Sequence, residues 1–595
     1  MGFQGLTGFG GGATGLSRIS ILDADPGWDS TPVVANSLRF NNPGTGWPIS
    51  SGDGAYLSKV FGTPTNTKIW TFSTWFKKCV GVEPGSANET ACGLFNGPWT
   101  GNQGRYGYIN IDHADQLVIF MGKYPTTSGD YIYFTSSEKL IDSSAWYHIC
   151  VAVDTTQATE SDRFSAYING VEVTSWDTED YPTQNEVYHI NNNDSSGHMI
   201  GAIKNTVNTG HSRWGNGYQA ETIFIDGQKK AASDFGLTDA TANQWVPKAY
   251  TGTYGNNGFR LKYDNTSDVG EDSSGNNNDW TATNFSTSAG AGNDILYDSP
   301  STSSGITTVG NYCTLNDLTN GGDSGTGFDL SNGNLVCTAP GSDGHRRVHS
   351  TMFMSSGKFY WEATCSKAQA SWYYSAIGMA RHDYVGDNET SNLPGYDSDK
   401  AFGIYQTARY YYNSTSTVSW GDTWGVNDVI GCAWDNGSIY FYKNGSIMNS
   451  GTAMLTGLSG EWSPIFHSYK DGEWTVNFGQ RPFAYTNAGV DRPAADFLAL
   501  TAFNLDATTI LSGTYEGNGD ADGPVVWMNG TPATLKIGTS NPPTSSVAFD
   551  PAVVDPLANG FKIRHASTNN VDGTTYYWLA TIDKAFKYAN AQTNE

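Results

Sequence analysis

Two segments far apart in this chain repeat the same order of features. In each, an apolar, strand-like run ends in Asp, an aromatic-rich run follows, and the chain turns at Asn-Gly. The first copy spans residues 149–154 and 167–170, and the second spans residues 430–435 and 440–445. Asn-Gly between such runs predicts a β-hairpin, because both central residues of a type I′ turn need a positive φ. The repeat therefore predicts two related β-sandwich units.

Composition favours a turn-rich β protein of several domains. The 595 residues include 70 Gly, 13% are aromatic and only 15% are charged. Aromatic residues suit half-buried strands, while Gly supplies turn conformations. Long amphipathic helices are hard to find, so we expect an all-β fold. The net charge of −25 is spread along the chain without blocks, which excludes nucleic acid as the main partner.

The cysteines and the apolar runs indicate the state of the thiols and whether the chain enters a membrane. The seven cysteines are odd in number and form no CxxC pair, so we expect buried, reduced thiols. They are Cys79, Cys92, Cys150, Cys313, Cys337, Cys365 and Cys432. Residues 1–15 hold no export signal, and no apolar run approaches the roughly 18 residues of a membrane span. We therefore expect no membrane insertion.

The pattern of strands and of Gly-rich stretches divides the chain into five regions. Residues 1–30 form a Gly-rich arm whose apolar residues Phe3, Leu6, Phe9 and Leu16 could attach it to a neighbouring protein. The other regions are a sandwich over 31–245, a Gly/Asn/Ser-rich connector over 246–309, a second sandwich over 310–490 and a small β domain over 491–595.

The order of motifs in the first sandwich resembles laminin-G-like domains of the concanavalin type. The motifs are Ser-Leu-Arg-Phe at 37–40, Trp-Thr-Phe-Ser at 70–73, Ala-Trp-Tyr-His at 145–148 and Tyr-Ile-Asn-Gly at 167–170. This resemblance implies a jelly-roll sandwich of two antiparallel sheets.

The second sandwich is similar to a SPRY (B30.2) domain. The segments that carry the similarity are 356–362, 377–380, 428–432, 441–445 and 462–466, in this order. The resemblance implies a second, twisted two-sheet sandwich.

The order of the modules over nearly the whole chain resembles multi-module virion proteins of marine tailed bacteriophages. The stretch Asn-Phe-Gly-Gln-Arg-Pro-Phe-Ala-Tyr at 477–485, placed between the second sandwich and the tail, is part of this resemblance. It implies a structural protein of the virion, of the fibre or adhesin type, that forms a homo-oligomer such as a trimer. Its partners would be other virion proteins and a glycan or protein of the host surface.

Motifs that suggest catalysis have simpler interpretations. Residues 10–15 fit the spacing G-x-G-x-x-G without the strand and helix that a dinucleotide site needs, and Gly-Asp-Ser-Gly at 322–325 reads as a turn. A sandwich glycosidase needs two facing carboxylates. Glu221 and Asp226 come nearest, but a spacing of five puts them on opposite faces of a regular strand. We expect no catalytic residue and no enzyme.

Two further candidates suggest a metal site only weakly. His148 follows Trp-Tyr on a strand, with no second His or Cys at metal spacing, so we expect a hydrogen-bonded sheet histidine. The loop from Asp272 to Asp279, with Asn276 and Asn278, could supply only some of the six to eight oxygens of a calcium site. An Asn/Gly turn is favoured, and we expect neither a metal nor a cofactor.

Aromatic clusters in the second sandwich are the candidate ligand-binding residues. Side chains alternate between the faces of a strand, so adjacent aromatic residues cannot all point inward. Exposed rings bind sugars or proteins through large, rigid surfaces. Alternatively, these aromatic residues cover the open side of the sandwich or lie in a subunit interface. The residues are Trp372, Tyr373, Tyr374, Tyr410, Tyr411, Tyr412, Trp420 and Trp424.

Three functions remain to be distinguished. The first is a fibre or adhesin of the virion that binds through many weak contacts at once. The second is a purely architectural part, either a capsid decoration or a tail scaffold, whose aromatic residues contact neighbouring subunits. The third is a virion enzyme that degrades surface polysaccharide, which would need a cleft with two carboxylates.

Overall fold

The computed structural model describes most of the two sandwiches and only the strands of the C-terminal region. The described residues are 34–41, 54–79, 92–98, 106–123, 131–205, 210–212, 215–239, 244–290, 292–301, 309–322, 327–367, 375–381, 384, 393–396, 398–413, 416–485, 497–505, 510–516, 525–527, 530–538, 546–547, 554–557, 560–563 and 575–585. The Gly-rich arm, with Phe3, Leu6, Phe9 and Leu16, lies outside them, as do Trp372, Tyr373 and Tyr374.

The first sandwich consists of two antiparallel sheets of eight strands each. The order in one sheet is β10-β9-β8-β3-β15-β1-β20, with β18 also paired to β15. Its strands are β1 (Ser37–Phe40), β3 (Ile69–Lys78), β8 (Trp146–Asp154), β9 (Phe164–Ile168), β10 (Val171–Glu172), β15 (Gly217–Asp226), β18 (Phe259–Leu261) and β20 (Ile295–Leu296).

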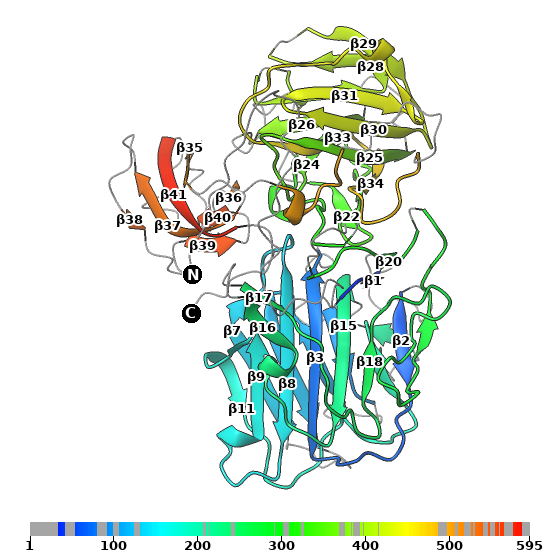
Figure 1. The fold of residues 1–595 in the computed structure, drawn as a ribbon, viewed down its shortest axis with the longest axis vertical. Coiled ribbons are helices and arrows are strands. Elements are labelled where there is room, and N and C mark those ends of the chain that lie inside the picture. Colours follow the sequence, from blue (N-terminus) through cyan, green and yellow to red (C-terminus); the bar gives the residue numbers. More distant parts are fainter. Residues whose placement is uncertain are drawn as a thin grey trace, which may run out of the picture.

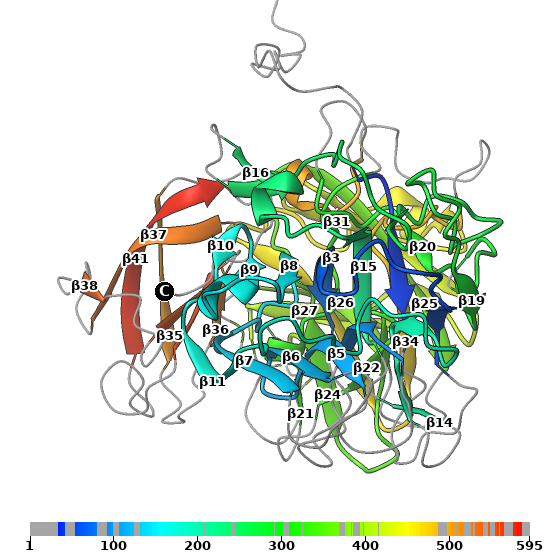
Figure 2. The same ribbon diagram turned by 90° about the horizontal axis from the view of Figure 1, so that it is seen from below.

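The facing sheet has the order β11-β7-β6-β5-β4-β12-β2-β19. Its strands are β2 (Tyr56–Lys59), β4 (Cys92–Asn96), β5 (Gly107–Ile111), β6 (Gln116–Gly122), β7 (Tyr131–Lys139), β11 (Trp176–Asp180), β12 (His198–Ile200) and β19 (Thr281–Thr283). Figure 2 shows β8, β3 and β15 in one layer and β7, β6 and β5 in the other. Short elements complete this half: the pairs β13 (Ile203–Asn205) with β14 (Gly210–Ser212) and β16 (Gly236–Asp239) with β17 (Gln244–Pro247), and the 3-10 helices η1 (Ser161–Arg163) and η3 (Ala232–Asp234).

The expected connector over 246–309 is in large part a component of the first sandwich. Its strands β18, β19 and β20 pair with β15, β2 and β1, so they complete both sheets. We did not expect this, because each strand has only two or three residues and gains its pairing from distant parts of the chain. The first sandwich thus extends well beyond residue 245.

The second sandwich has two antiparallel sheets of seven strands, in the orders β21-β24-β33-β26-β27-β28-β29 and β22-β23-β34-β25-β30-β31-β32. The first contains β21 (Gly321–Gly322), β24 (His345–His349), β26 (Ala376–Arg381), β27 (Ala401–Tyr405), β28 (Thr407–Tyr411), β29 (Val418–Thr423) and β33 (Trp462–Tyr469). The second contains β22 (Asp329–Ser331), β23 (Val336–Thr338), β25 (Lys358–Lys367), β30 (Val429–Asp435), β31 (Ser438–Lys443), β32 (Ser446–Ile447) and β34 (Glu473–Asn477). The 3-10 helices η4 (Asp317–Thr319), η6 (Asn449–Gly451) and η7 (Ala502–Asn504) accompany them.

The C-terminal region adds two small sheets, in the orders β35-β41-β37-β38 and β36-β40-β39. Their strands are β35 (Ile510–Glu516), β36 (Val525–Trp527), β37 (Gly530–Gly538), β38 (Ser546–Val547), β39 (Val554–Leu557), β40 (Gly560–Ile563) and β41 (Thr575–Ala585). In Figure 1 they lie beside the two stacked sandwiches. The expected all-β class with tandem β-sandwiches is confirmed.

Both Asn-Gly pairs form the predicted hairpins. Asn169 and Gly170 have φ values of 50° and 83°, and Asn444 and Gly445 have 49° and 83°, as type I′ turns require. Each Asn also joins its hairpin to the neighbouring strand. Asn169 Oδ1 accepts a hydrogen bond from the backbone N–H of His148 at 2.7 Å, and Asn444 Oδ1 accepts one from Val429 at 2.9 Å. The repeated sequence thus encodes the same local structure twice.

A buried ion pair joins the first sandwich to the segment that leads into the second. Lys77, near the end of β3, donates to Asp298 Oδ2 at 2.9 Å, to Asn311 Oδ1 at 2.7 Å and to the Tyr312 carbonyl oxygen at 2.7 Å. Both charged side chains are fully buried. The indole of Trp146 donates to the second oxygen of Asp298. Burial raises the pKa of Asp298 and Lys77 opposes that rise, so the carboxylate depends on this lysine.

Further contacts cross directly between the two sandwiches. Arg39 on β1 donates to the Asn332 carbonyl oxygen at 3.2 Å, and the hydroxyl of Tyr218 on β15 donates to the Gly333 carbonyl oxygen. A single cluster of buried apolar residues runs through both units, from Val34 to Leu505. The two sandwiches therefore share one continuous core, and Figure 1 shows one stacked on the other.

Candidate functional site

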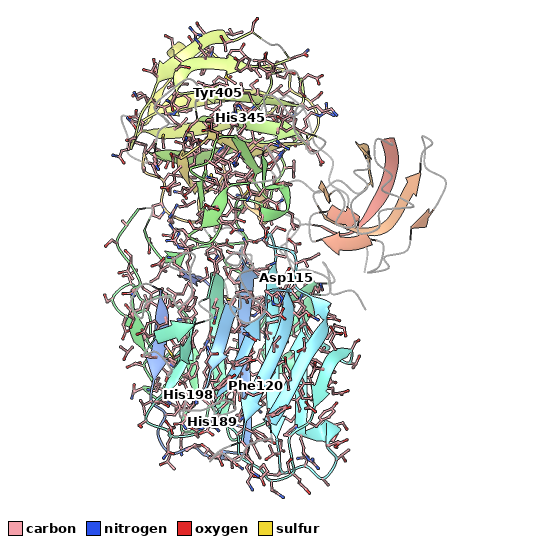
Figure 3. All side chains as sticks on the ribbon, turned by 180° about the vertical axis from the view of Figure 1, so that it is seen from behind. Asp115, Phe120, His189, His198, His345 and Tyr405 are labelled. Atoms are coloured by element: carbon pink, nitrogen blue, oxygen red, sulfur yellow. The ribbon has the colours of Figure 1, made fainter. Side chains whose placement is uncertain are left out.

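A row of six aromatic rings crosses the outer face of one sheet in the second sandwich; we name it the ring row. It consists of Tyr469, His345, His467, Tyr405, Tyr411 and Tyr396. Successive ring centroids lie 5.0–6.2 Å apart. A hydrogen bond of 2.9 Å joins His345 Nδ1 to His467 Nε2. Figure 3 shows His345 and Tyr405 close together in this sandwich.

The middle of the ring row is closed to solvent. His467 is 0% exposed and Tyr405 is 3% exposed, while Tyr396, Tyr411 and Tyr469 are half-buried. A Cβ built on Gly403 would lie 3.4 Å from the Cβ of Pro394, which shows that the loop carrying Pro394 packs directly on the sheet. Burial, together with the neighbouring Tyr396, raises the pKa of Tyr411. The centre of the ring row is therefore an internal contact of the second sandwich.

The sequence-predicted aromatic residues are divided between the two faces of this sheet. Tyr411 lies on the outer face, in the ring row, whereas Tyr410, Tyr412 and Trp420 are half-buried and pack against the core. Trp424 is buried, so it does not supply the exposed ring that we expected. Period-two alternation explains why Tyr411 and its two neighbours separate. Of the expected set that the structure describes, only Tyr411 faces outward from the sheet.

A second group of rings lies on the outer face of the sheet β7-β6-β5 in the first sandwich, and we did not predict it. We name it the outer aromatic patch: Tyr106, Tyr108, Phe120, Tyr131 and Tyr133. Figure 3 shows the position of Phe120, far from the ring row. The aromatic residues occupy every second position of their segments, and this alternation is the sequence signal that places them on one face of each strand. The sequence does not reveal that these three strands are neighbours, so the group could not be assembled from it.

The nearest pair of carboxylates has structural roles. Arg260 Nε donates to Glu221 Oε1 at 2.6 Å, and a bulge places Glu221 at a φ of 48°. Burial raises the pKa of Glu221, and Arg260 opposes that rise. Asp226 accepts backbone N–H groups from Thr65, Asn66 and Asn257. Both carboxylates are therefore engaged in contacts within the first sandwich.

His148 is the hydrogen-bonded sheet histidine that we expected. Its Nε2 lies 2.9 Å from Ser73 Oγ, and its Nδ1 accepts a hydrogen bond of 3.1 Å from the Trp245 indole. Burial lowers its pKa to about 3, so the ring is neutral at physiological pH.

The loop from Asp272 to Asp279 uses its own oxygens to hold its turns. Asp272 accepts hydrogen bonds from the backbone of Arg260, Ser274 and Asn278, and Asp279 accepts one from the backbone of Asp272. Asn276 and Asn278 direct their amide N–H groups to backbone carbonyls. Within the described residues, no group of three or more His, Cys, Asp or Glu side chains could hold a metal ion.

All seven cysteines are free thiols, and six of them are buried. Burial raises the pKa of Cys92 to about 12 and that of Cys313 and Cys365 to about 11. The expected burial of the cysteines is confirmed for all but Cys92, which is partly exposed. None of the helices in the described part of the chain is long and apolar enough to cross a membrane.

The second sandwich also matches a known family. The SPRY domain family matches residues 358–481, from the start of β25 to just beyond β34. The chain contains a SPRY domain. The match to the SPRY domain includes Tyr405, Tyr411 and His467 of the ring row, while His345 on β24 precedes it.

Solved structures similar to this chain include three SPRY domains. The SPRY domain of human HERC1 has 15% identity and a TM-score of 0.20, and covers 26% of this chain and 91% of its own. A human SPRY domain has 16% identity and a TM-score of 0.21, with 26% and 97% covered. The TRIM65 PSpry domain has 15% identity and a TM-score of 0.22, with 28% and 89% covered. No curated protein matches the chain.

Proposed function

We propose that this protein is a structural protein of a phage virion, of the fibre or adhesin type. In this proposal the first sandwich is laminin-G-like, the Gly-rich arm attaches the chain to other virion proteins, and several copies act together as a homo-oligomer. Multivalent binding then follows from effective concentration: weak contacts of single copies multiply when several copies engage one host surface.

The observation that carries the proposal is the rigid junction between the sandwiches. The buried Lys77–Asp298 pair and the continuous core fix the two units in one orientation. A rigid pair of sandwiches holds its outer faces at a set separation, so the second contact of a surface-bound particle costs little further entropy. A flexible linker between the units would lose that advantage.

The architectural alternative is favoured by one observation, the closure of the ring row. Rings that are half-buried or buried in the single chain suit contacts within the protein or with neighbouring subunits. Under this alternative, Tyr411 and the half-buried end of the ring row would contact another virion protein rather than the host.

Immunogold electron microscopy of phage particles produced by the strain that carries this gene tests the proposal. We expect label at the free ends of fibres. Label confined to the capsid surface or to the inner tail would favour the architectural alternative, and particles without label would refute a virion protein. Particles that lack the gene are the matched control for non-specific label.

A further inference from the structure

The outer aromatic patch is organised around one residue, Phe120. Its ring centroid lies 5.2 Å from that of Tyr106, 5.4 Å from Tyr108, 5.6 Å from Tyr131 and 5.8 Å from Tyr133. Phe120 and Tyr108 are stacked, with an angle of 26° between their planes. Four tyrosines therefore surround one phenylalanine on the outside of a sheet, where a purely structural face usually carries small polar residues.

The pairing of the strands explains why these rings gather and why they remain partly open. Phe120 on β6 lies directly opposite Tyr108 on β5 and Tyr133 on β7, so the three rings form one row across the sheet. Gly122 lies opposite Tyr131 and supplies no side chain to cover the rings. Tyr131 is 41% exposed and Tyr106, Phe120 and Tyr133 are half-buried, whereas Tyr108 is only 6% exposed. The patch thus presents both ring area and phenol hydroxyls.

Two asparagines beside the patch carry unused acceptors. Asn96 lies directly opposite Tyr108, and Asn110 is two residues from Tyr108 on the same strand, so both belong to the outer face. Asn96 is 0% exposed and Asn110 is 1% exposed. Their Oδ1 atoms accept no hydrogen bond from the described part of the chain. An unpaired buried acceptor costs about 1–3 kcal/mol. Because both side chains are closed to solvent, this cost belongs to the folded sheet, and the rings form the accessible part of the patch.

We propose that the outer aromatic patch binds a neutral, hexose-rich glycan. A pyranose ring presents C–H groups from one face, which stack on aromatic rings, and hydroxyl groups from its edge, which can form hydrogen bonds with tyrosine hydroxyls. The charges beside the patch do not suit an anionic ligand. Asp180 lies opposite Tyr133, Lys123 is already ion-paired with Glu186 at 3.0 Å, and the whole chain has a net charge of −25. Glycan binding by the patch is argued from its residues, and only the biological role of this binding rests on the proposed adhesive function.

The test uses the purified full chain and a printed array of neutral hexose and N-acetylhexosamine oligosaccharides, with sulfated and sialylated forms beside them. We expect binding to neutral members only. Isothermal titration with the best oligosaccharide then compares variants. Tyr131→Ala, at the exposed edge, should weaken binding about three- to tenfold, and Phe120→Ala should abolish measurable binding, because it removes the ring that all four tyrosines contact.

A matched control and three outcomes make the test decisive. Tyr167→Ala removes a half-buried tyrosine from the opposite sheet of the same sandwich and should leave the affinity unchanged. No binding to any neutral member, preference for anionic glycans, or equal affinities of Tyr131→Ala and wild type would each overturn the proposal. If Phe120→Ala instead alters the oligomeric state in sedimentation and Tyr131→Ala binds normally, the patch is a contact between copies. Binding on the array does not depend on the position of the protein in a virion. A negative array result is therefore distinct from a negative immunogold result.

Discussion

The two sandwiches place aromatic rings on outer sheet faces in different ways. In the ring row, the central rings are buried, and a hydrogen bond joins its two histidines. In the outer aromatic patch, Tyr131 is 41% exposed and Tyr106, Phe120 and Tyr133 are half-buried. Outward aromatic residues therefore do not by themselves mark a binding site. A set of rings that is closed to solvent stabilises the fold, while a set with an exposed ring can bind a ligand.

The largest effect is expected from a substitution in the buried junction between the two sandwiches. Lys77→Met leaves Asp298 buried without its charge partner, so we expect a loss of about 3–5 kcal/mol in the free energy of unfolding. In calorimetry, the two sandwiches of the wild type should unfold in one transition, and those of the variant in two. Lys470→Met removes an exposed lysine whose ion pair with Asp343 is worth little, and serves as control. A single unshifted transition in Lys77→Met would contradict a coupled core.

A pair of ring deletions compares the two faces directly. Tyr405→Ala removes a buried ring and should cost about 3 kcal/mol of stability, whereas Phe120→Ala removes a half-buried ring and should cost about 1 kcal/mol. Urea denaturation followed by tryptophan fluorescence measures both values. Equal costs would show that the two ring sets have the same structural role.

The two Asn-Gly hairpins provide a finer comparison. Asn169→Ala and Asn444→Ala each lose the side-chain hydrogen bond to a neighbouring strand and should each cost about 1–2 kcal/mol in urea denaturation. Replacement by Asp should separate them. Asn169→Asp keeps an acceptor for His148 N–H, but Asn444→Asp replaces an N–H group that donates to Asp428 at 2.7 Å, and the two carboxylates would repel. Equal stability of the two Asp variants would refute the assigned contacts.

The smallest expected effect concerns pH and the second sandwich alone. Burial raises the pKa of Glu461 to about 7. An acid with a raised pKa in the folded state stabilises the fold below its unfolded pKa, near 4.5, and loses that contribution as pH rises toward 7. We expect a decrease of about 1 kcal/mol over this window, after allowance for partial exposure. Glu461→Gln should flatten this part of the stability profile, and a profile identical to wild type would contradict the raised pKa.

The fold was largely predictable where local patterns were strong. Asn-Gly at 169 and 444 predicts the hairpins because the turn residues specify the backbone. A few strands were expected in the connector, but the pairing of β18, β19 and β20 with β15, β2 and β1 was not, since segments of two or three residues carry no periodic signal. Local sequence therefore predicted the sandwiches better than their boundaries.

The candidate site was less predictable than the fold. Alternation requires that Tyr410 and Tyr411 face opposite sides, but it does not say which one faces the core. Tyr108, Phe120 and Tyr133 lie on three strands whose order in the sheet only the structure reveals. A surface formed across several strands depends on the order of the strands in the sheet, whereas each hairpin is specified by its local sequence.

Oligosaccharide titration of Phe120→Ala and Tyr405→Ala, beside wild type and at a temperature where all three are folded, tests the central claim most directly. We expect Phe120→Ala to keep most of its stability and to lose neutral-glycan binding, whereas Tyr405→Ala should lose stability and bind the glycan with wild-type affinity. Loss of binding in Tyr405→Ala together with full binding in Phe120→Ala would contradict this claim.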